Sequence, residues 1–271
     1  MILDWAKGGN NNGNQLSHFD NFFNWTMSYR LDSDIPYNYG RFVPKIRVDM
    51  STITFDRLEN KSKFAIWMSS HCETASQREI YIKELMKYVQ VDIIGSCSND
   101  ANSSLTSRIC VMTSHLEGSS EECLQHLSAT YKFYLSFENS LCKDYVTEKF
   151  YRTAQFDLIP VVLNGANMSL FAPPHSYIDV QDFNSPKELA TYLEIVGNHK
   201  ELYNSYFWWK PFYNVEHQFT ATPFSTYFCN LCRKINEYDA NRDGQKVYQN
   251  IAKWWMTDGK CYNTTKLLKN I

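Results

Sequence analysis

Short apolar runs alternate with amphipathic stretches through the middle of the chain. The runs have the length of buried strands and cover residues 64–69, 91–95, 131–137, 159–163 and 177–180. The stretches between them predict helices at 76–89, 121–129 and 147–156, and one long helix at 186–209 with Pro186 in its first turn. Strands that alternate with helices imply a parallel sheet covered on both faces, so the predicted fold class is α/β.

The two ends of the chain lack this rhythm. Residues 1–20 are rich in Asn and Gly and are expected to be poorly ordered. Residues 213–271 form a cysteine-containing tail in which one helix is expected, at 245–255. The pattern therefore divides the chain into an N-terminal part at 1–60, an α/β unit at 61–212 and a tail at 213–271.

Composition limits the class and the location of the protein. A formal net charge of −2 over 271 residues gives no reason to expect nucleic-acid binding. Eight cysteines together with five N-glycosylation sequons favour a secretory-pathway lumen, where disulfides persist. The sequons begin at Asn24, Asn60, Asn102, Asn167 and Asn263. No run of about 20 apolar residues exists and the first apolar run is too short for a signal peptide, so we interpret the sequence as a fragment, a processed form or an incomplete gene model.

The cysteine and glycine patterns exclude several cofactor sites. Cys229 and Cys232 have the spacing of a zinc half-site, but Cys261 is the only later cysteine and no paired histidines complete a set. We therefore expect these cysteines to form disulfides, with Cys261 or elsewhere, and we expect no metal site. The absence of Gly-x-Gly-x-x-Gly and of a Walker A sequence argues against NAD, FAD and P-loop nucleotide binding.

The stretch Phe133–Arg152, which reads FYLSFENSLCKDYVTEKFYR, carries the clearest chemistry. Its apolar strand breaks at a polar cluster that begins with Glu138, and helical spacing resumes at Thr147, a plausible N-cap. A strand, a polar loop and a helix N-terminus in this order are how open α/β sheets present ligand sites. The helix terminus and Lys149 favour a phosphate.

Two further charged residues extend this picture. Arg78 begins another helix after a strand, and its planar fork suits phosphate oxygens. Two cations at a helix terminus stabilise a departing diphosphate without a metal. Glu148 is unusual beside a phosphate and better suits sugar hydroxyls or positive charge that develops on a sugar ring. Spacing alone therefore suggests a nucleotide sugar.

Plainer interpretations of the same residues stay open on spacing alone. Glu148 and Lys149 also fit ordinary solvated residues of a first helical turn, and Arg78 fits a surface position. Asn139 is common in turns, and Tyr145 fits a core position.

Several linked segments make the match specific. The residues 23–40, 131–152, 160–193 and 201–210 resemble the α1,3-fucosyltransferase family, and FENS followed by DYVTEK is the most specific part. The resemblance covers about residues 21–265. It implies a two-lobed GT-B fold and inverting transfer of fucose from GDP-fucose to a GlcNAc residue of a glycan, of the N-glycan core or the N-acetyllactosamine type.

The resemblance also implies partners and a location. GDP-fucose is a substrate, no cofactor or divalent metal is required, and the acceptor is a glycan or glycoprotein. A homo-oligomer is kept as a candidate assembly. Full-length relatives are type II membrane proteins whose catalytic part lies in the Golgi lumen.

The family's functional residues map onto positions found above. Arg78 matches the arginine at the donor diphosphate, and Lys149 matches the phosphate-binding lysine. Asn139 and Tyr145 match donor-site residues, and Glu148 matches the carboxylate near fucose and the ribose. Residues 61–212 then correspond to the Rossmann-like donor lobe, 1–60 to a remnant of the acceptor lobe, and 213–271 to a tail that packs back toward that lobe.

One departure from the family pattern bears on activity. Relatives carry a Glu-Ser-Pro motif upstream of the segment FNWT, and its glutamate resembles the general base that takes the proton from the acceptor hydroxyl. This chain has no such motif, so its catalytic residues are unknown; His18, Asp20, Asp32 and Asp34 are candidate substitutes. We therefore expect a donor site with little or no transferase activity, and the alternative function is a truncated form that only binds donor or glycan.

Overall fold

The computed structural model describes residues 16–50, 56–98, 110, 121–217, 223–238 and 246–268. The expected disorder at 1–20 falls mostly outside these residues, and so does the sequon at Asn102. Among the residues described, no helix has both the length and the apolar character that crossing a bilayer requires.

A five-stranded sheet forms the centre of the molecule, in the order β5-β4-β6-β7-β8, and all its neighbouring strands are parallel. The strands are β4 (Lys63–Met68), β5 (Val91–Ile94), β6 (Tyr131–Phe137), β7 (Ile159–Leu163) and β8 (Ile178–Asp179). The helices associated with the sheet are α2 (Arg78–Leu85), α4 (Glu121–Thr130), α5 (Glu148–Ala154), α6 (Pro186–Asn198) and α7 (Lys200–Ser205). The predicted alternation of strands and helices is thus confirmed.

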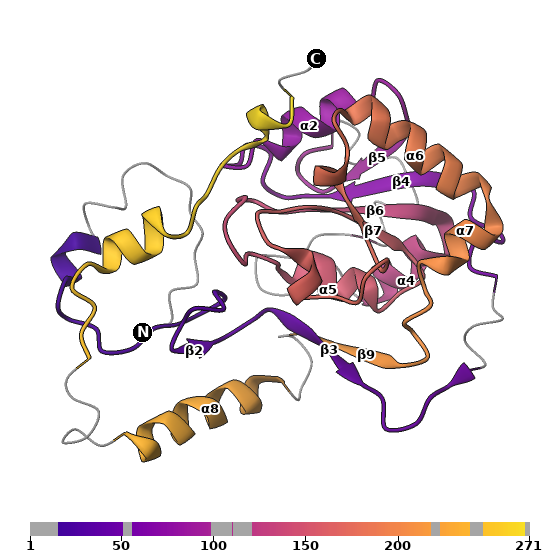
Figure 1. Cartoon of the computed structure of the whole chain (residues 1–271). Helices are drawn as coiled ribbons and strands as arrows, with labels where there is room; N and C mark the ends of the chain where they lie inside the picture. Colours follow the sequence, from indigo (N-terminus) through magenta and orange to yellow (C-terminus); the bar gives the residue numbers. More distant parts are fainter. Residues whose placement is uncertain are drawn as a thin grey trace.

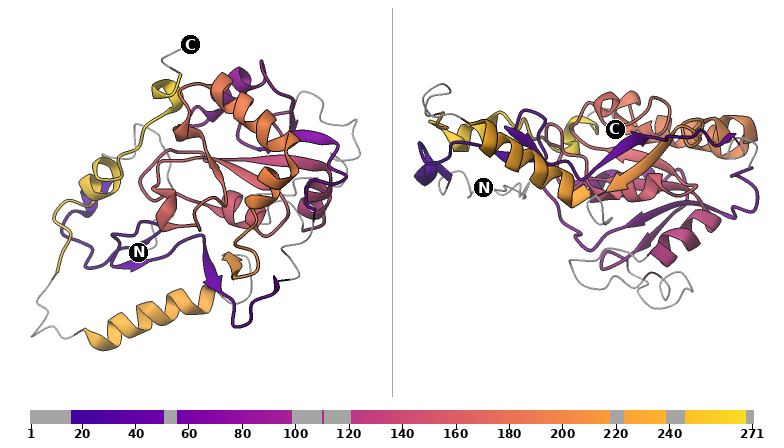
Figure 2. Two further views of the ribbon diagram at one scale, coloured as in Figure 1. Left: turned by 45° about the vertical axis from the view of Figure 1, so that its right-hand side comes forward. Right: turned by 90° about the horizontal axis from the view of Figure 1, so that it is seen from below.

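The helices cover both faces of this sheet (Figures 1 and 2). On β6, Phe133 and Leu135 point into the core beneath α2 and α6, whereas Tyr134 belongs to the core on the α4 side. Successive strand residues point to opposite faces, and with both faces covered the whole strand reads as one apolar run. This explains why the strands were recognisable in the sequence.

Smaller elements lie outside the sheet. Two short parallel strands, β1 (Met27–Ser28) and β2 (Ile35–Pro36), form one pair, and β3 (Gly40–Pro44) pairs antiparallel with β9 (Tyr213–His217). The remaining elements are α8 (Pro223–Glu237), the π-helix η5 (Lys253–Thr257) and the 3-10 turns η1 (Ser17–Phe19), η3 (Met168–Leu170), η4 (Val180–Asp182) and η6 (Thr264–Lys266). Figure 1 shows α8 and the π-helix η5 well away from the sheet, whereas η6 lies beside α2.

The long helix predicted at 186–209 is wrong. The structure has two helices, α6 and α7, separated by His199, whose backbone is extended with φ −117° and ψ 105°. Gly197 and Asn198 are poor helix formers. The break turns α7 so that Tyr203 is fully buried and its hydroxyl donates to the carbonyl of Lys132 at 2.7 Å.

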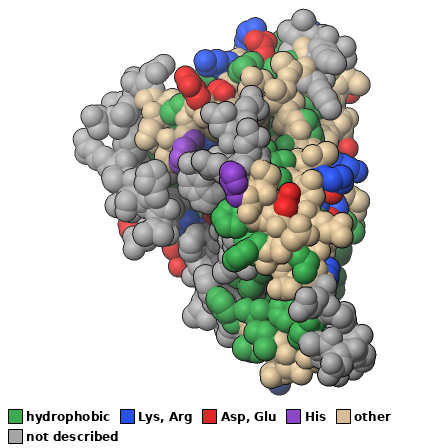
Figure 3. Space-filling model, turned by 90° about the vertical axis from the view of Figure 1, so that its left-hand side faces the viewer, with side chains coloured by type: hydrophobic (Ala, Val, Ile, Leu, Met, Phe, Trp, Pro, Cys, Tyr) green, Lys and Arg blue, Asp and Glu red, His purple; other side chains and the backbone are tan. Residues whose placement is uncertain are grey.

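The helix predicted at 245–255 is also wrong at its start, because helical backbone begins at Ile251 and continues as the π-helix η5. The fifteen-residue helix α8 was not predicted. On the face of the molecule that Figure 3 shows, hydrophobic side chains gather at the lower end. Phe228 and Ile235 on α8, and Tyr238 directly after it, are exposed.

Three disulfides occur, Cys72–Cys97, Cys110–Cys123 and Cys142–Cys261. The expected pairing of Cys229 and Cys232 is wrong, since both thiols are free and exposed on α8. Cys261 instead pairs with Cys142, because the tail crosses the loop after β6, where the amide of Lys143 donates to the carbonyl of Gly259 at 2.8 Å.

Candidate functional site

The candidate site lies at the point where the strand order of the sheet reverses. The chain moves from β4 outward to β5 and then crosses back to β6 on the other side of β4. In open α/β sheets, ligands bind outside the carboxyl ends of the strands at such a switch point. The residues that follow β4 and β6, which include Arg78 and the segment 138–149, meet there.

Thr147 and Lys149 are positioned by the buried end of β6. The carboxylate of Glu138, which is 1% exposed, accepts hydrogen bonds from the amide of Thr147 at 2.8 Å and from its hydroxyl at 2.9 Å. Thr147 is the N-cap of α5, as predicted. The ammonium of Lys149 donates to Thr147 Oγ1 at 2.9 Å and lies 3.2 Å from Glu148 and 3.3 Å from Glu138.

The charges in this cluster are coupled. Burial raises the pKa of Glu138, and Lys149 offsets this only partly. Burial also acts to raise the pKa of Glu148, but the charge of Lys149 and the hydrogen bonds to the carboxylate together outweigh it, so the pKa is lowered. Burial acts to lower the pKa of Lys149, yet the two carboxylates raise it above its usual value. Lys149 is therefore a firmly held cation at neutral pH beside the ionised Glu148.

Arg78 lies at the floor of the switch point. Its guanidinium donates to the carbonyl of Phe137 at the end of β6 and, at 2.7 Å, to the hydroxyl of Ser69 at the end of β4. The residue is 1% exposed, and its Nε atom has no partner within the described part of the chain. Arg78 thus joins the two strands from below and adds positive charge beneath the site.

Asn139 and Tyr145 occupy the loop between β6 and α5. The carbonyl of Asn139 accepts from the amide of Ser76 at 3.0 Å, and its buried side-chain oxygen has no partner among the residues described. Tyr145 is buried against the rings of Tyr29, at 4.8 Å, and Tyr39, at 6.0 Å. Burial raises the pKa of Tyr145.

Comparison with known proteins gives the family. Residues 58–254 match the model described as "Glycosyltransferase family 10 (fucosyltransferase) C-term", and residues 5–40 match the model "Fucosyltransferase, N-terminal". The chain belongs to glycosyltransferase family 10. The α1,3-fucosyltransferase resemblance seen in the sequence is thereby confirmed.

Two relatives from Drosophila melanogaster illustrate the similarity within family 10. The chain is 33% identical to "Alpha-(1,3)-fucosyltransferase C" over 270 residues, which covers 93% of this chain and 58% of that protein. It is 37% identical to "Glycoprotein 3-alpha-L-fucosyltransferase A" over 254 residues, which covers 91% of this chain and 45% of that protein. The chain thus spans about half the length of these relatives.

A solved structure supports the GT-B type of α/β fold in this family 10 chain. The match is to "Crystal Structure of alpha1,3-Fucosyltransferase with GDP-fucose", with a TM-score of 0.56 and 17% identity. It covers 88% of this chain and 75% of that one. At this identity the likeness concerns the fold alone.

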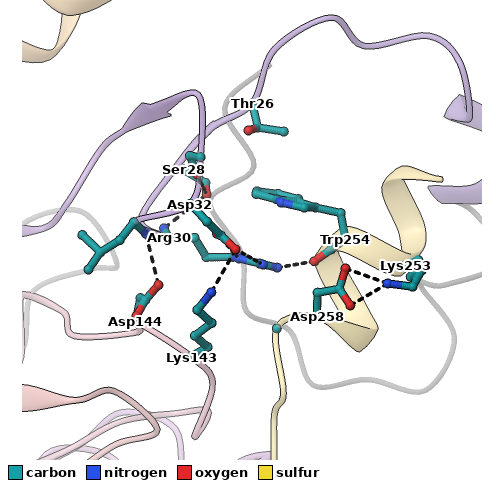
Figure 4. A network of polar contacts seen from close by, with 12 residues as sticks. Thr26, Ser28, Arg30, Asp32, Lys143, Asp144, Lys253, Trp254 and Asp258 are labelled. Carbon is teal, nitrogen blue, oxygen red and sulfur yellow. Dashed lines mark hydrogen bonds and ion pairs between the residues drawn. The ribbon is translucent and has the colours of Figure 1, made fainter. Parts of the chain in front are cut away.

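Residues 16–44 and 223–268, which we call the peripheral segments, contact the loop between β6 and α5 at Lys143 and Asp144 (Figure 4). Asp32 pairs with Arg30 at 2.7 Å and with Lys143 at 2.9 Å, and the amide of Leu31 donates to Asp144 at 3.1 Å. The guanidinium of Arg30 also donates to the carbonyl of Trp254. The tail thus contacts the N-terminal residues at Arg30 and Asp34.

The candidate substitutes for a general base are engaged in these contacts. Asp34 accepts from the amide of Thr26 at 2.9 Å and from the hydroxyl of Tyr248 at 2.8 Å, and it pairs with Lys246. For both Asp32 and Asp34, burial acts to raise the pKa, but the hydrogen-bonded cations lower it overall. Asp20 accepts from the amide of Ile251 at 3.0 Å, and His18 lies in η1. Carboxylates with lowered pKa values are weak bases.

The structure therefore brings Arg78, Asn139, Glu148 and Lys149 to one edge of the sheet, with Tyr145 where that edge meets the peripheral segments. Within the described residues no group of three or more metal-ligating side chains occurs. A depression of about 480 Å³ lies elsewhere, lined by Lys45, Gln155 and Lys210 among others. Glu138 was given no role from the sequence, although an acidic residue directly after a seven-residue buried strand is itself a signal.

Proposed function

We propose that this chain binds GDP-fucose at the carboxyl ends of β4 and β6 and contains the donor lobe of an inverting α1,3-fucosyltransferase. The observation that carries the proposal is the ammonium of Lys149, held beside Glu148 at the switch point of a family 10 fold. Residues 61–212 are then the donor lobe, 1–60 the remnant of the acceptor lobe, and 213–271 the tail that joins them.

Each residue has a role that follows from its charge and position. Lys149 binds the diphosphate directly, because its side chain is 21% exposed. Arg78 stabilises the same anion from the floor of the site. Glu148 faces the sugar and the ribose, and Asn139 and Tyr145 complete the donor site.

The proposed reaction follows from these roles. The oxygen of an acceptor GlcNAc hydroxyl attacks the anomeric carbon of fucose while the bond from that carbon to the diphosphate oxygen breaks. GDP leaves with the electron pair, the configuration inverts, and the hydroxyl proton passes to a base. Lys149 and Arg78 stabilise the charge that develops on GDP, so a divalent metal is not required. Golgi glycans, of the N-glycan core or N-acetyllactosamine type, are the proposed acceptors.

The donor site is tested by measuring GDP affinity with isothermal titration calorimetry. We expect Lys149→Ala to lose a charge-assisted contact of about 1.5–3 kcal/mol, which raises Kd by roughly 10- to 150-fold. Arg78→Lys should weaken binding less, because a cation remains. Lys87→Ala is the matched control, since Lys87 is exposed and pairs with Glu84. Unchanged affinity in Lys149→Ala would overturn the assignment.

A second candidate function is donor or glycan binding without transfer. The observation in its favour is that Asp32 and Asp34 are already bound by cations. Labelled GDP-fucose is offered to the purified chain with a core N-glycan and with N-acetyllactosamine. Transfer above background to either acceptor excludes the binding-only form, whereas GDP binding without transfer supports it.

A further inference from the structure

Glu138 lies in the interior of the protein, and each of its polar groups forms a hydrogen bond. Its amide donates to the carbonyl of Leu163 on β7 at 3.0 Å, and its carbonyl accepts from the hydroxyl of Ser76 at 2.7 Å. Its two carboxylate oxygens each accept one hydrogen bond from Thr147. One residue thus joins β7, the loop before α2 and the start of α5.

The burial of this charge needs an explanation. A buried ion pair often contributes no more stability than apolar side chains of similar size. Glu138 is 1% exposed and lies at the end of a strand whose neighbouring side chains are apolar. Packing alone would be served by an apolar residue, so the carboxylate points to a requirement of the site.

The hydroxyl of Thr147 links Glu138 to Lys149, because it donates to Glu138 and accepts from Lys149. A threonine hydroxyl has one proton to donate and two lone pairs that accept. The ammonium of Lys149, 3.3 Å away, pairs with Glu138 as a carboxylate despite its burial, and both carboxylate oxygens accept from Thr147. A carboxylate can only accept, so the hydroxyl proton of Thr147 points toward it. The lone pairs then face Lys149, and they accept from its amide at 3.4 Å and from its ammonium at 2.9 Å.

We infer that Glu138 is a positioning residue, which orients Thr147 and thereby holds the Lys149 ammonium where the donor diphosphate binds. This inference rests on the proposed function of Lys149. Glu138 also lies 3.3 Å from the ammonium, so it supplies a fixed counter-charge on the side away from solvent. Lys149 is therefore held in place before the donor arrives, which reduces the loss of side-chain entropy on binding.

The sharpest test is Glu138→Gln, which preserves size and still accepts from the amide of Thr147. Its amide group donates to Thr147 Oγ1, so the hydroxyl proton turns toward the N–H groups of Lys149. We expect the Kd for GDP to rise about tenfold. Glu84→Gln is the matched control, because Glu84 pairs with Lys87 on the surface and should leave Kd unchanged.

A second variant separates positioning from simple stability. Thr147→Val removes the hydroxyl at nearly constant volume and should raise Kd by a similar factor. If the two residues act through one network, the loss of GDP affinity in the double variant should be smaller than the sum of the two single losses. A structural role alone would lower the melting temperature and leave Kd unchanged, and that result, or additive effects, overturns the inference.

The outcomes also separate this inference from the proposed function. If Lys149→Ala retains GDP affinity, the donor-site assignment fails. If Lys149→Ala loses affinity while Glu138→Gln keeps it, only the positioning role fails. Should Glu138→Gln not fold, Thr147→Val alone decides, because unchanged affinity in that variant contradicts the proposed network.

Discussion

The sheet lobe, residues 63–205, and the peripheral segments, residues 16–44 and 223–268, are held together in different ways. In the sheet lobe, large apolar side chains such as Phe133, Val161 and Leu189 are fully buried in one continuous core. Among the residues described, the core near β1 and β2 consists of Met27, Ile35 and Tyr37, with Leu231 packed against it.

Polar contacts take the place of a large core in the peripheral segments. Asp32 pairs with Lys143, and Asp34 accepts a hydrogen bond from the hydroxyl of Tyr248. The disulfide Cys142–Cys261 links the tail to the loop after β6. The proposed donor site therefore lies on the region that has the continuous apolar core. Glu138 and Lys149 belong to the sheet lobe. Tyr29 of the peripheral segments contacts this lobe through the ring of Tyr145.

The largest expected effect comes from the core of the sheet lobe. Phe133→Ala removes a side chain that is 0% exposed and should lower the free energy of unfolding by about 3–5 kcal/mol. Phe22→Ala, at a peripheral residue that is 68% exposed, should change it by less than about 0.5 kcal/mol. Urea unfolding followed by fluorescence measures both. Similar values for the two variants would contradict the proposed difference.

The next effect is a pH dependence at His217, on the strand β9 that joins the two regions. Burial, and then the charge of Arg152, lower the pKa of His217 to about 4. The unfolded chain binds this proton near pH 6.5, so the stability that the neutral ring contributes is complete above that pH. It is lost as pH falls toward 4, by at most about 3 kcal/mol.

The variant His217→Gln should therefore be less sensitive to pH than the parent between pH 7 and pH 4. Chemical unfolding at several pH values gives the two slopes. The exposed residue His199 provides the control variant His199→Gln. Equal slopes for the parent and His217→Gln would exclude the buried neutral histidine as the cause.

The contrast between the continuous core of the sheet lobe and the small cores outside it also explains how much of the fold could be predicted. The strand at 159–163 and the helix that follows Thr147 were recognisable because apolar runs and N-caps act over a few residues. The break at His199 was missed because the burial of Tyr203, a tertiary effect, competes with local helical spacing. The helix α8 was missed because, within the described residues, its side chain Leu231 packs against the small cluster at β1 and β2 and not against the continuous core of the sheet.

The sequence predicted which charged residues form the candidate site, but not how their side chains are held in place. Lys149 and Glu148 were found because their spacing follows a strand and an N-cap. The burial of Arg78 beneath the site depends on its contacts with Phe137 and Ser69, which are distant in sequence. The anchoring of Asp34 by Lys246 and Tyr248 spans more than 200 residues and no local pattern encodes it.

The smallest predicted effect concerns this anchor. Asp34→Asn keeps the shape but removes the charge that binds Lys246 and Tyr248, and it should cost about 1–2 kcal/mol. Because folding lowers the pKa of Asp34, the ionised carboxylate contributes stability above the pKa of the unfolded chain. This stability is lost as pH falls through the folded pKa. Hydrogen exchange should increase in residues 246–258, while the Kd for GDP stays unchanged because Lys149 is held within the sheet lobe. A loss of GDP affinity as large as that of Lys149→Ala would mean that the donor site depends on the peripheral segments after all.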